Sequence, residues 1–287
     1  MALKLMYITN RPNVARIAES SGVDRIFVDM EYIGKAARQG KRNSVRNHHT
    51  VEDVKRIRRV LTKSELLVRV NPIHQESEGY PSSEKEIDGV IDAGVDIVML
   101  PFFKTVAEVQ RFIDAVGGRC RTMLLLETPE AVEALDDILA IRGVDEIHIG
   151  INDLSIGYGK TFMFELLTDG TVEGLCRRMQ AAGAFYGFGG IASLGRGLVP
   201  AERIVREHYR LGSRMAILSR SFCNVDKLED MTAIEEVFFR GIREIRTLEQ
   251  ECASHIRYFT DNQRELKAAV DAVVERAGRK DGPGCIF

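Results

Sequence analysis

The chain has 287 residues, of which 45% are hydrophobic, and a formal net charge of −2. This length fits one large α/β barrel or two smaller domains. A charge so close to zero gives no basic field for nucleic acid or an anionic membrane, so we expect a small-molecule partner. The five cysteines lack C-x-x-C spacing and no apolar run is long enough to span a bilayer, which predicts a cytoplasmic protein with reduced thiols.

Strand-like and helix-like segments alternate along the first three quarters of the chain. Eight short apolar runs predict strands covered on both faces, and the seven segments between them have helical spacing. This alternation favours a (β/α)₈ TIM barrel over residues 1–225. The expected strands are 4–9, 25–30, 65–70, 96–101, 121–128, 146–151, 186–192 and 214–220, and the expected helices are 14–20, 51–61, 84–93, 106–116, 129–141, 172–182 and 200–211.

The remaining segment, residues 226–278, is too long for a single closing helix. An apolar stripe through Ile234, Phe238 and Ile245 predicts one helix, and residues 262–276 predict a second helix that is charged on most faces. A helix that extends past its own barrel suits contact with another subunit. We therefore expect these helices to pack on or exchange with a neighbouring subunit of a homo-oligomer, and residues 279–287 to form a flexible tail.

Two acidic residues follow consecutive predicted strands in the middle of the chain. Glu127 ends the fifth strand and Asp153 follows the sixth. Side chains at the carboxyl ends of parallel strands converge at the mouth of a barrel. Two carboxylates there suit a hard cation such as Mg²⁺ or Mn²⁺ better than zinc. Alternatively, each acid taken alone could simply stabilise the start of a helix or a turn.

Arg69 lies at the end of the third predicted strand, in an apolar run. A buried guanidinium is costly unless an anion meets it. One interpretation is a forked clamp for a substrate carboxylate across the mouth from the metal. The other is a structural ion pair.

The second strand ends with two acids and a phenol. Alternation directs Asp29 and Glu31 to the same side, where either could hold a metal-bound water or orient a proton carrier. Both could equally make hydrogen bonds that anchor the loop. Tyr32 follows them directly and is a candidate proton carrier.

Further candidates for the mouth come from the next loop and from the last strands. Residues 35–46 form a basic loop that could cover an anionic site, and His48 and His49 follow it. Adjacent histidines on regular structure cannot both face one point, so surface or cap roles compete with catalysis for them. Residues 187–190 and 219–222 end the seventh and eighth strands, where barrels often bind phosphate; close packing of a helix would require the same glycines and is the alternative.

Five motifs together resemble the HpcH/HpaI aldolase and citrate lyase β family. They are FVDME at 27–31, VRVN at 68–71, VMLP at 98–101, LETPEA at 126–131 and IGINDLS at 149–155. The resemblance implies a barrel of the phosphoenolpyruvate/pyruvate type that binds Mg²⁺, Mn²⁺ or a similar ion through Glu127 and Asp153. It further implies that Arg69 holds the pyruvyl oxygens, that the turn from Gly150 to Asn152 and Asp153 receives the carboxylate, and that the eighth helix is exchanged between subunits.

Two positions depart from the family pattern. Aldolases of the family carry histidine, and citrate lyase-like members aspartate, where this chain has Tyr32; the aldolases also have glutamine at the position of Leu125.

We expect a carbon–carbon lyase of the class II aldolase type, which acts through a metal-stabilised pyruvate enolate on pyruvate or a related 2-oxo acid and an aldehyde. The alternatives are a citrate/malyl-CoA lyase-like thioester lyase and a non-catalytic barrel that binds a metal and an oxo acid.

Overall fold

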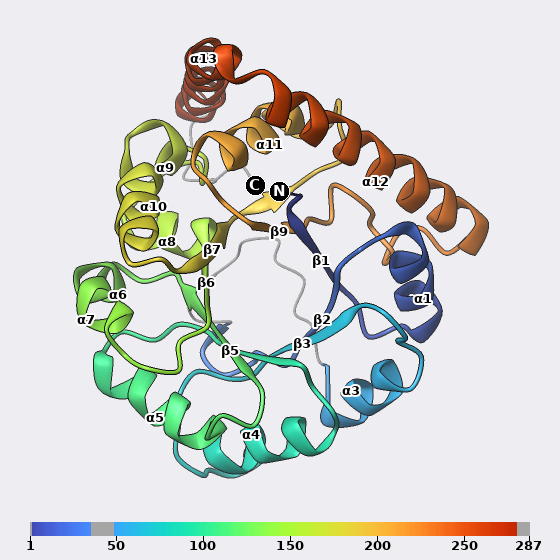
Figure 1. Cartoon of the computed structure of the whole chain (residues 1–287), viewed down its shortest axis with the longest axis vertical. Helices are drawn as coiled ribbons and strands as arrows, with labels where there is room; N and C mark the ends of the chain where they lie inside the picture. The colour runs from blue at the N-terminus through green and yellow to red at the C-terminus, as the bar shows by residue number, and fades with distance from the viewer. Residues whose placement is uncertain (1, 36–48, 280–287) are drawn as a thin grey trace.

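The computed structural model describes residues 2–35 and 49–279, and it is a nearly closed barrel of parallel strands surrounded by helices (Figure 1). The strand order is β7-β6-β5-β4-β3-β2-β1-β9-β8, so neighbours in sequence are neighbours in space around most of the ring. The predicted barrel is therefore confirmed. Its strands are β1 (Lys4–Ile8), β2 (Arg25–Asp29), β3 (Glu65–Arg69), β4 (Ile97–Leu100), β5 (Arg121–Leu126), β6 (Glu146–Ile149), β7 (Phe185–Phe188), β8 (Gly190–Ile191) and β9 (Met215–Leu218).

The seventh predicted strand, residues 186–192, is divided into β7 and β8. Gly189 separates the two with a φ of +54°, a conformation that favours glycine. β7 pairs with β6, whereas β8 pairs with β9, so the bend carries the chain across the point where the ring closes. Gly187 permits this closure because a Cβ there would lie 2.1 Å from the carbonyl oxygen of Met215.

Helices cover the outside of the barrel. Most match the prediction to within a few residues, but the predicted helix at 129–141 is broken at Ala134, where ψ is 4°. Thr50 and Thr105 each form a capping box at the start of the following helix, which explains why those two boundaries were readable from sequence. The helices are α1 (Pro12–Ser21), α3 (Val51–Arg58), α4 (Ser83–Asp92), α5 (Val106–Val116), α6 (Pro129–Glu133), α7 (Leu135–Leu139), α10 (Thr171–Ala181) and α11 (Ala201–Arg210), with two short unpredicted helices, α8 (Ile151–Gly157) and α9 (Glu165–Thr168).

The interior of the barrel is apolar in the middle and charged at its amino-terminal end. Phe27, Met99 and Leu125 belong to one buried cluster inside the ring. Below them the buried Arg25 donates to both carboxylate oxygens of Glu146, at 2.5 and 2.8 Å. Arg25 and Glu146 thus pair with each other at the amino-terminal end, whereas parallel barrels carry their functional side chains at the opposite, carboxyl-terminal end.

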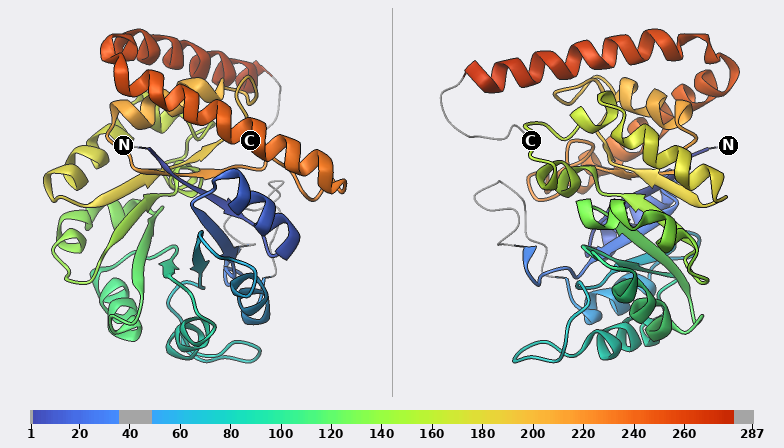
Figure 2. Two further views of the ribbon diagram at one scale, coloured as in Figure 1. Left: turned by 45° about the vertical axis from the view of Figure 1, so that its right-hand side comes forward. Right: turned by 90° about the vertical axis from the view of Figure 1, so that its left-hand side faces the viewer.

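The C-terminal region forms two long helices joined by a short 3₁₀ turn, η1 (Ile256–Tyr258). The first, α12 (Met231–Ser254), contacts α1 and α11 and completes the ring of helices around its own barrel (Figures 1 and 2). Its predicted apolar stripe is buried: Ile234, Phe238 and Ile245 are all inaccessible to solvent. Exchange of these helices between subunits stays a prediction.

The second helix, α13 (Phe259–Arg279), lies across α11 and α9. Asn262 donates hydrogen bonds to the carbonyl oxygen of Arg203 at 3.1 Å and to Glu207 Oε1 at 2.9 Å, and Leu266 and Val270 are buried beneath the helix. Of the predicted tail, only Arg279 lies within the described residues. None of the helices within residues 2–35 and 49–279 combines the length and the apolar character that a membrane span requires.

Candidate active site

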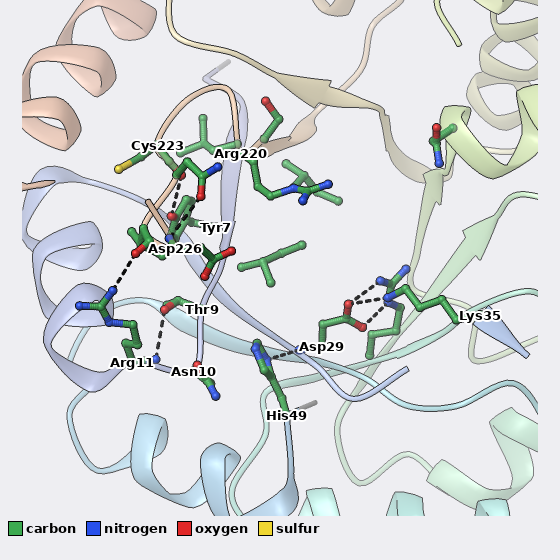
Figure 3. Close-up of a pocket in the computed structure, with 18 residues that line it drawn as sticks. Tyr7, Thr9, Asn10, Arg11, Asp29, Lys35, His49, Arg220, Cys223 and Asp226 are labelled. Carbon is green, nitrogen blue, oxygen red and sulfur yellow. Dashed lines mark hydrogen bonds and ion pairs between the residues drawn. The ribbon is translucent and has the colours of Figure 1, made fainter. Parts of the chain in front are cut away.

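A cavity of about 310 Å³ opens at the carboxyl ends of β1, β2, β3 and β9 (Figure 3). Asp29, His49, Arg69 and Asn152, four of the residues singled out in the sequence, line it together. They come from separate segments of the chain, and the barrel brings them to one mouth. The cavity therefore lies at the carboxyl ends of the strands, where the sequence places these candidate residues.

Asp29 and Arg69 form the centre of a buried ionic cluster. β2 and β3 pair with these two residues directly opposite each other, and Arg69 donates from Nε and Nη2 to the two oxygens of Asp29, each at 2.8 Å. Lys35 Nζ lies 2.9 Å from Asp29 and 3.4 Å from Glu31, and Arg69 Nη1 lies 3.2 Å from Glu31. Two acids and two bases thus neutralise one another, as a buried group of charges requires.

The cluster fixes the charge of its members. Burial disfavours the charged form of Asp29, but Arg69 and Lys35 outweigh it and hold the pKa of this carboxyl well below its usual range. Burial likewise opposes the charge of Arg69, and Asp29, Glu31 and Glu127 raise its pKa. The structural ion pair is therefore present. Its hydrogen bonds to Asp29 use two of the five guanidinium N–H groups, and Nη1 forms an ion pair with Glu31.

His49 stands beside this cluster in a defined tautomer. Its Nδ1 accepts a hydrogen bond from the backbone N–H of Asp29 at 3.0 Å, so the neutral ring carries its proton on Nε2. Burial lowers the pKa of His49, and this effect exceeds the opposing influence of Asp29, Asp53 and Asp226. At neutral pH the ring is a hydrogen-bond donor rather than a base.

Tyr32 lies apart from the cavity. Its side chain is 40% exposed and stacks on Tyr80 with 6.1 Å between the ring centroids. Its backbone N–H donates to Asn71 Oδ1 at 2.8 Å, which anchors the loop. Tyr32 is not among the described residues that line the two cavities at the mouth, and its role as a proton carrier stays a prediction. His48 and residues 36–46 of the basic loop lie outside the described residues.

Glu127 and Asp153 line a second cavity, of about 330 Å³, beside the first. Glu127 is 4% exposed, and its Oε1 accepts a hydrogen bond from the backbone N–H of Phe102 at 3.0 Å. Phe102 has a φ of +49°, and it is the one non-glycine residue in the described ranges with a positive φ. Gly150 closes the other side, because a Cβ there would lie 2.7 Å from Glu127 Oε2. The Glu127 carboxylate is thus held between two backbone segments.

The two cavities meet at adjacent residues. Asn152 lines the first cavity and Asp153 the second, and Asn152 Nδ2 donates to Asp153 Oδ1 at 3.0 Å. Glu127 also acts electrostatically on Arg69 across this boundary. The predicted metal ligands and the predicted carboxylate clamp therefore belong to one mouth.

The donor set of Glu127 and Asp153 fits Mg²⁺ or Mn²⁺. Both side chains offer only hard oxygen atoms, and within the described ranges no group of three or more His, Cys, Asp or Glu side chains could hold a metal ion. Mg²⁺ is commonly held by one or two protein carboxylates, with substrate oxygens and water completing its shell. Two carboxylates at a cavity are compatible with that mode of binding.

Three features of the site were not singled out from the sequence. Lys35 was considered only as part of a basic loop, although its spacing of four residues from Glu31 could have suggested an ion pair. No sequence pattern predicts the positive φ of Phe102, because aromatic residues rarely adopt that conformation. Asp226 lines the first cavity but lies far along the chain from the other site residues.

The HpcH/HpaI aldolase/citrate lyase family model matches residues 4–165. One similar solved structure is an HpcH/HpaI aldolase from Desulfitobacterium hafniense DCB-2, with 16% identity and a TM-score of 0.57 over 85% of this chain and 93% of that one. An HpcH/HpaI aldolase/citrate lyase family protein from Burkholderia cenocepacia J2315 has 16% identity and a TM-score of 0.59 over 82% of this chain and 95% of that one. Citrate synthase SbnG has 16% identity and a TM-score of 0.59 over 82% of this chain and 94% of that one. At these identities the similarity supports the fold.

A pyruvate kinase from Mycobacterium intracellulare is 36% identical over 80 residues, which is 26% of this chain and 16% of that protein. The chain thus spans less than a fifth of the length of this curated relative. The family model, by contrast, covers more than half of the chain. The chain belongs to the HpcH/HpaI aldolase/citrate lyase family, a family of lyase type.

Proposed function

We propose that the protein is a metal-dependent carbon–carbon lyase of the class II aldolase type, which forms or cleaves an aldol of pyruvate or a related 2-oxo acid. The observation that carries the proposal is the meeting of two cavities at one barrel mouth. One cavity presents Arg69, and the other presents the carboxylates of Glu127 and Asp153. Membership of a lyase-type family supports the same assignment.

Glu127 and Asp153 would hold the divalent ion. When bound, Mg²⁺ or Mn²⁺ supplies Lewis-acid polarisation of the 2-oxo group, which acidifies the neighbouring methyl group. The contribution of the chain is to keep the Glu127 carboxylate fixed between Phe102 and Gly150. Such preorganisation spares the cost of reordering the ligand during the reaction.

Arg69 would bind the oxo acid. Its N–H groups that do not bond to Asp29 can donate to the oxygens of pyruvate while Asp29 and Glu31 hold the guanidinium in place. Asn152 lies at the boundary of the two cavities, and its side-chain amide offers a neutral donor to the carboxylate of pyruvate. Asp29 is therefore a positioning residue in this account, because its ionised carboxylate already accepts three charged hydrogen bonds.

His49 would donate a hydrogen bond to the carbonyl oxygen of the aldehyde. The neutral ring presents Nε2–H while its Nδ1 is engaged by the backbone of Asp29. A fixed neutral donor stabilises the negative charge that develops on this oxygen during carbon–carbon bond formation. Since neither Nδ1 of His49 nor the Asp29 carboxylate is available as a strong base, solvent in the cavity would accept the methyl proton.

Exchange of the pyruvate methyl protons tests this function without knowledge of the aldehyde. The protein is incubated in D₂O with pyruvate and Mg²⁺ or Mn²⁺, and deuterium uptake is followed by mass spectrometry. We expect metal-dependent uptake that is lost in Glu127→Gln and in Asp153→Asn. Glu130→Gln is the matched control, because Glu130 lines the same cavity but pairs with Lys104 at 2.8 Å.

Two outcomes would favour other functions. Uptake that requires coenzyme A or an acyl-CoA would support a thioester lyase. Absence of uptake with every divalent ion, while pyruvate still binds, would contradict turnover and support a barrel that only binds a metal and an oxo acid.

A further inference from the structure

Asn71 follows the third strand and holds the turn that follows the second. It lies two residues beyond the end of β3 and is buried. Its Oδ1 accepts a hydrogen bond from the backbone N–H of Tyr32 at 2.8 Å and another from that of Ile33 at 2.9 Å. These two residues lie between Glu31 and Lys35, which the turn contributes to the buried ionic cluster. One amide oxygen therefore holds the middle of the turn that brings both charged side chains to the cluster.

The side chain of Asn71 has one orientation that satisfies its surroundings. Its oxygen faces two backbone donors, and its Nδ2 donates to Glu86 Oε1 at 2.8 Å. The backbone nitrogen of Asn71 also donates towards Glu86, at 3.4 Å from Oε1 and 3.3 Å from Oε2. A half-turn of the amide would place its nitrogen against two N–H donors and its oxygen against a carboxylate. Glu86 thus fixes the direction in which the amide faces.

Glu86 is a buried acid in the first turn of α4, and its side chain is 6% exposed as part of the residue. Glu84 of the same helix pairs with Arg111 at 2.6 Å, whereas none of the ion pairs within residues 2–35 and 49–279 involves Glu86. Burial raises the pKa of Glu86, and the hydrogen bonds from Asn71 and the charge of His74 oppose this effect. Because a buried carboxylate without a cation is costly, its presence indicates that this position requires a hydrogen-bond acceptor.

We infer that Glu86 is a positioning residue of the proposed active site, which acts through Asn71 on the turn that carries Glu31 and Lys35. The inference rests on the proposed function and adds to it a residue that lines neither cavity at the mouth. Without Glu86 the amide is free to rotate, the turn loses its anchor, and Arg69 loses the partner that holds its Nη1. The apparent affinity for pyruvate then falls with the fraction of molecules in which the turn is in place.

The proposed metal ligands do not depend on this turn. Glu127 follows β5 and Asp153 lies in α8, whereas the turn follows β2. The Glu127 carboxylate has its own anchor in the backbone N–H of Phe102. Loss of Glu86 should therefore weaken pyruvate binding and spare metal binding, whereas a general loss of stability would weaken both.

Hydrogen exchange of backbone amides tests the hold on the turn directly. The full-length wild type, Glu86→Gln and Glu86→Leu are transferred to D₂O without ligands, and the peptide that contains residues 30–35 is followed by mass spectrometry. Glutamine keeps one neutral acceptor for Asn71, and leucine keeps none. We expect the N–H groups of Tyr32 and Ile33 to exchange about three- to tenfold faster in Glu86→Gln and about 10- to 100-fold faster in Glu86→Leu, because the first loses the charge of an acceptor and the second loses its hydrogen bonds.

A control and a double variant establish the route. Glu84→Gln is the matched control, because Glu84 is an acid of the same helix that pairs with Arg111, and it should leave the exchange of the turn unchanged. Asn71→Ala should speed the exchange at least as much as Glu86→Leu, and the two changes together should add nothing further, since both act through one contact. Unchanged exchange in both Glu86 variants, or additive effects in the double variant, would overturn the inference.

Binding of pyruvate connects the turn to the site. The Kd for pyruvate in the presence of Mn²⁺ should rise by at least about threefold in Glu86→Leu, because the binding-competent fraction falls. The Kd for Mn²⁺ alone should equal that of the wild type, and Glu84→Gln should leave both constants unchanged. A pyruvate Kd equal to that of the wild type in Glu86→Leu, or a parallel loss of affinity for Mn²⁺, would contradict a positioning role.

The methyl exchange of pyruvate in the wild type separates the two levels of the account. If it occurs and Glu86→Leu leaves the pyruvate Kd unchanged, the positioning role alone is overturned. Absence of methyl exchange with every divalent ion overturns the proposed function and the role of Glu86 within it. The amide exchange of the turn then still decides whether Glu86 acts through Asn71.

Discussion

Asp29 is the residue whose removal should destabilise the barrel mouth most clearly. Asp29→Asn keeps the shape of the side chain but leaves Glu31 as the acidic partner of Arg69 and Lys35 among the ion pairs of the described residues. The net charge of these four side chains then changes from zero to +1. Loss of one partner from a buried pair costs about 3–5 kcal/mol. For a protein of this size that free energy corresponds to a fall in Tm of roughly 6–20 °C.

Urea unfolding followed by circular dichroism at pH 7 measures this loss. The control is Asp88→Asn, because Asp88 forms an exposed ion pair with Arg119 at 2.7 Å, and such pairs contribute about 0–1 kcal/mol. A loss in Asp29→Asn no larger than that of the control would refute the description of the cluster.

The pH dependence of the same variant provides a second check. Burial opposes ionisation of Asp29, but Arg69 and Lys35 depress its folded-state pKa below the ordinary value near 3.9. A depressed pKa contributes stability that is fully present above the unfolded pKa and is lost as the pH falls below it. The difference between wild type and Asp29→Asn should therefore be constant from pH 7 to about pH 4 and shrink below that. A difference that begins to shrink near pH 6 would point to another group.

Three further predictions concern the site. Gly150→Ala should displace the Glu127 carboxylate and weaken Mn²⁺ binding, measured by calorimetry, by at least about tenfold. Gly174→Ala is the control, because a Cβ at Gly174 meets open space and should leave Mn²⁺ binding unchanged. Equal Mn²⁺ affinities of the two variants would contradict the description of Glu127 as held between Phe102 and Gly150. His49→Ala should lower kcat/KM for aldol formation by about 10²- to 10³-fold, whereas Tyr32→Phe should keep a kcat/KM close to that of the wild type. A larger loss of kcat/KM in Tyr32→Phe than in His49→Ala would instead support the phenol as the proton carrier. Arg69→Lys should raise the Kd for pyruvate in a fluorescence titration because a single ammonium cannot reproduce the fork, and an unchanged Kd would reduce Arg69 to a structural role.

Much of the fold was readable from the sequence because each local signal agrees with the barrel. Alternating apolar strands and helices of the right length predicted the architecture, and the predicted helix starts at residues 51 and 106 coincide with the capping boxes that Thr50 and Thr105 form in the structure. The division of the seventh strand was not foreseen. It depends on the close approach of Gly187 to Met215, a contact between segments that no local pattern reveals.

The candidate site was readable only in part, for a similar reason. Strand ends placed Asp29, Arg69 and Glu127 at the mouth, because the end of a parallel strand fixes the position of its side chain. Which partner each charge takes depends on distances across the mouth. The sequence left open whether Arg69 forms an ion pair, and the structure pairs it with Asp29. The sequence also could not predict the tautomer of His49, which is set by the hydrogen bond from the backbone N–H of Asp29.

The central claim is that Glu127 and Asp153 hold a divalent ion beside Arg69. A crystal structure of the protein with Mn²⁺ and pyruvate, with anomalous data collected to locate the manganese, tests it most directly. The account predicts one strong anomalous peak in contact with a carboxylate oxygen of Glu127 and one of Asp153, and pyruvate between that peak and the guanidinium of Arg69. A manganese peak at any other group of side chains, or pyruvate bound away from Arg69, would contradict it.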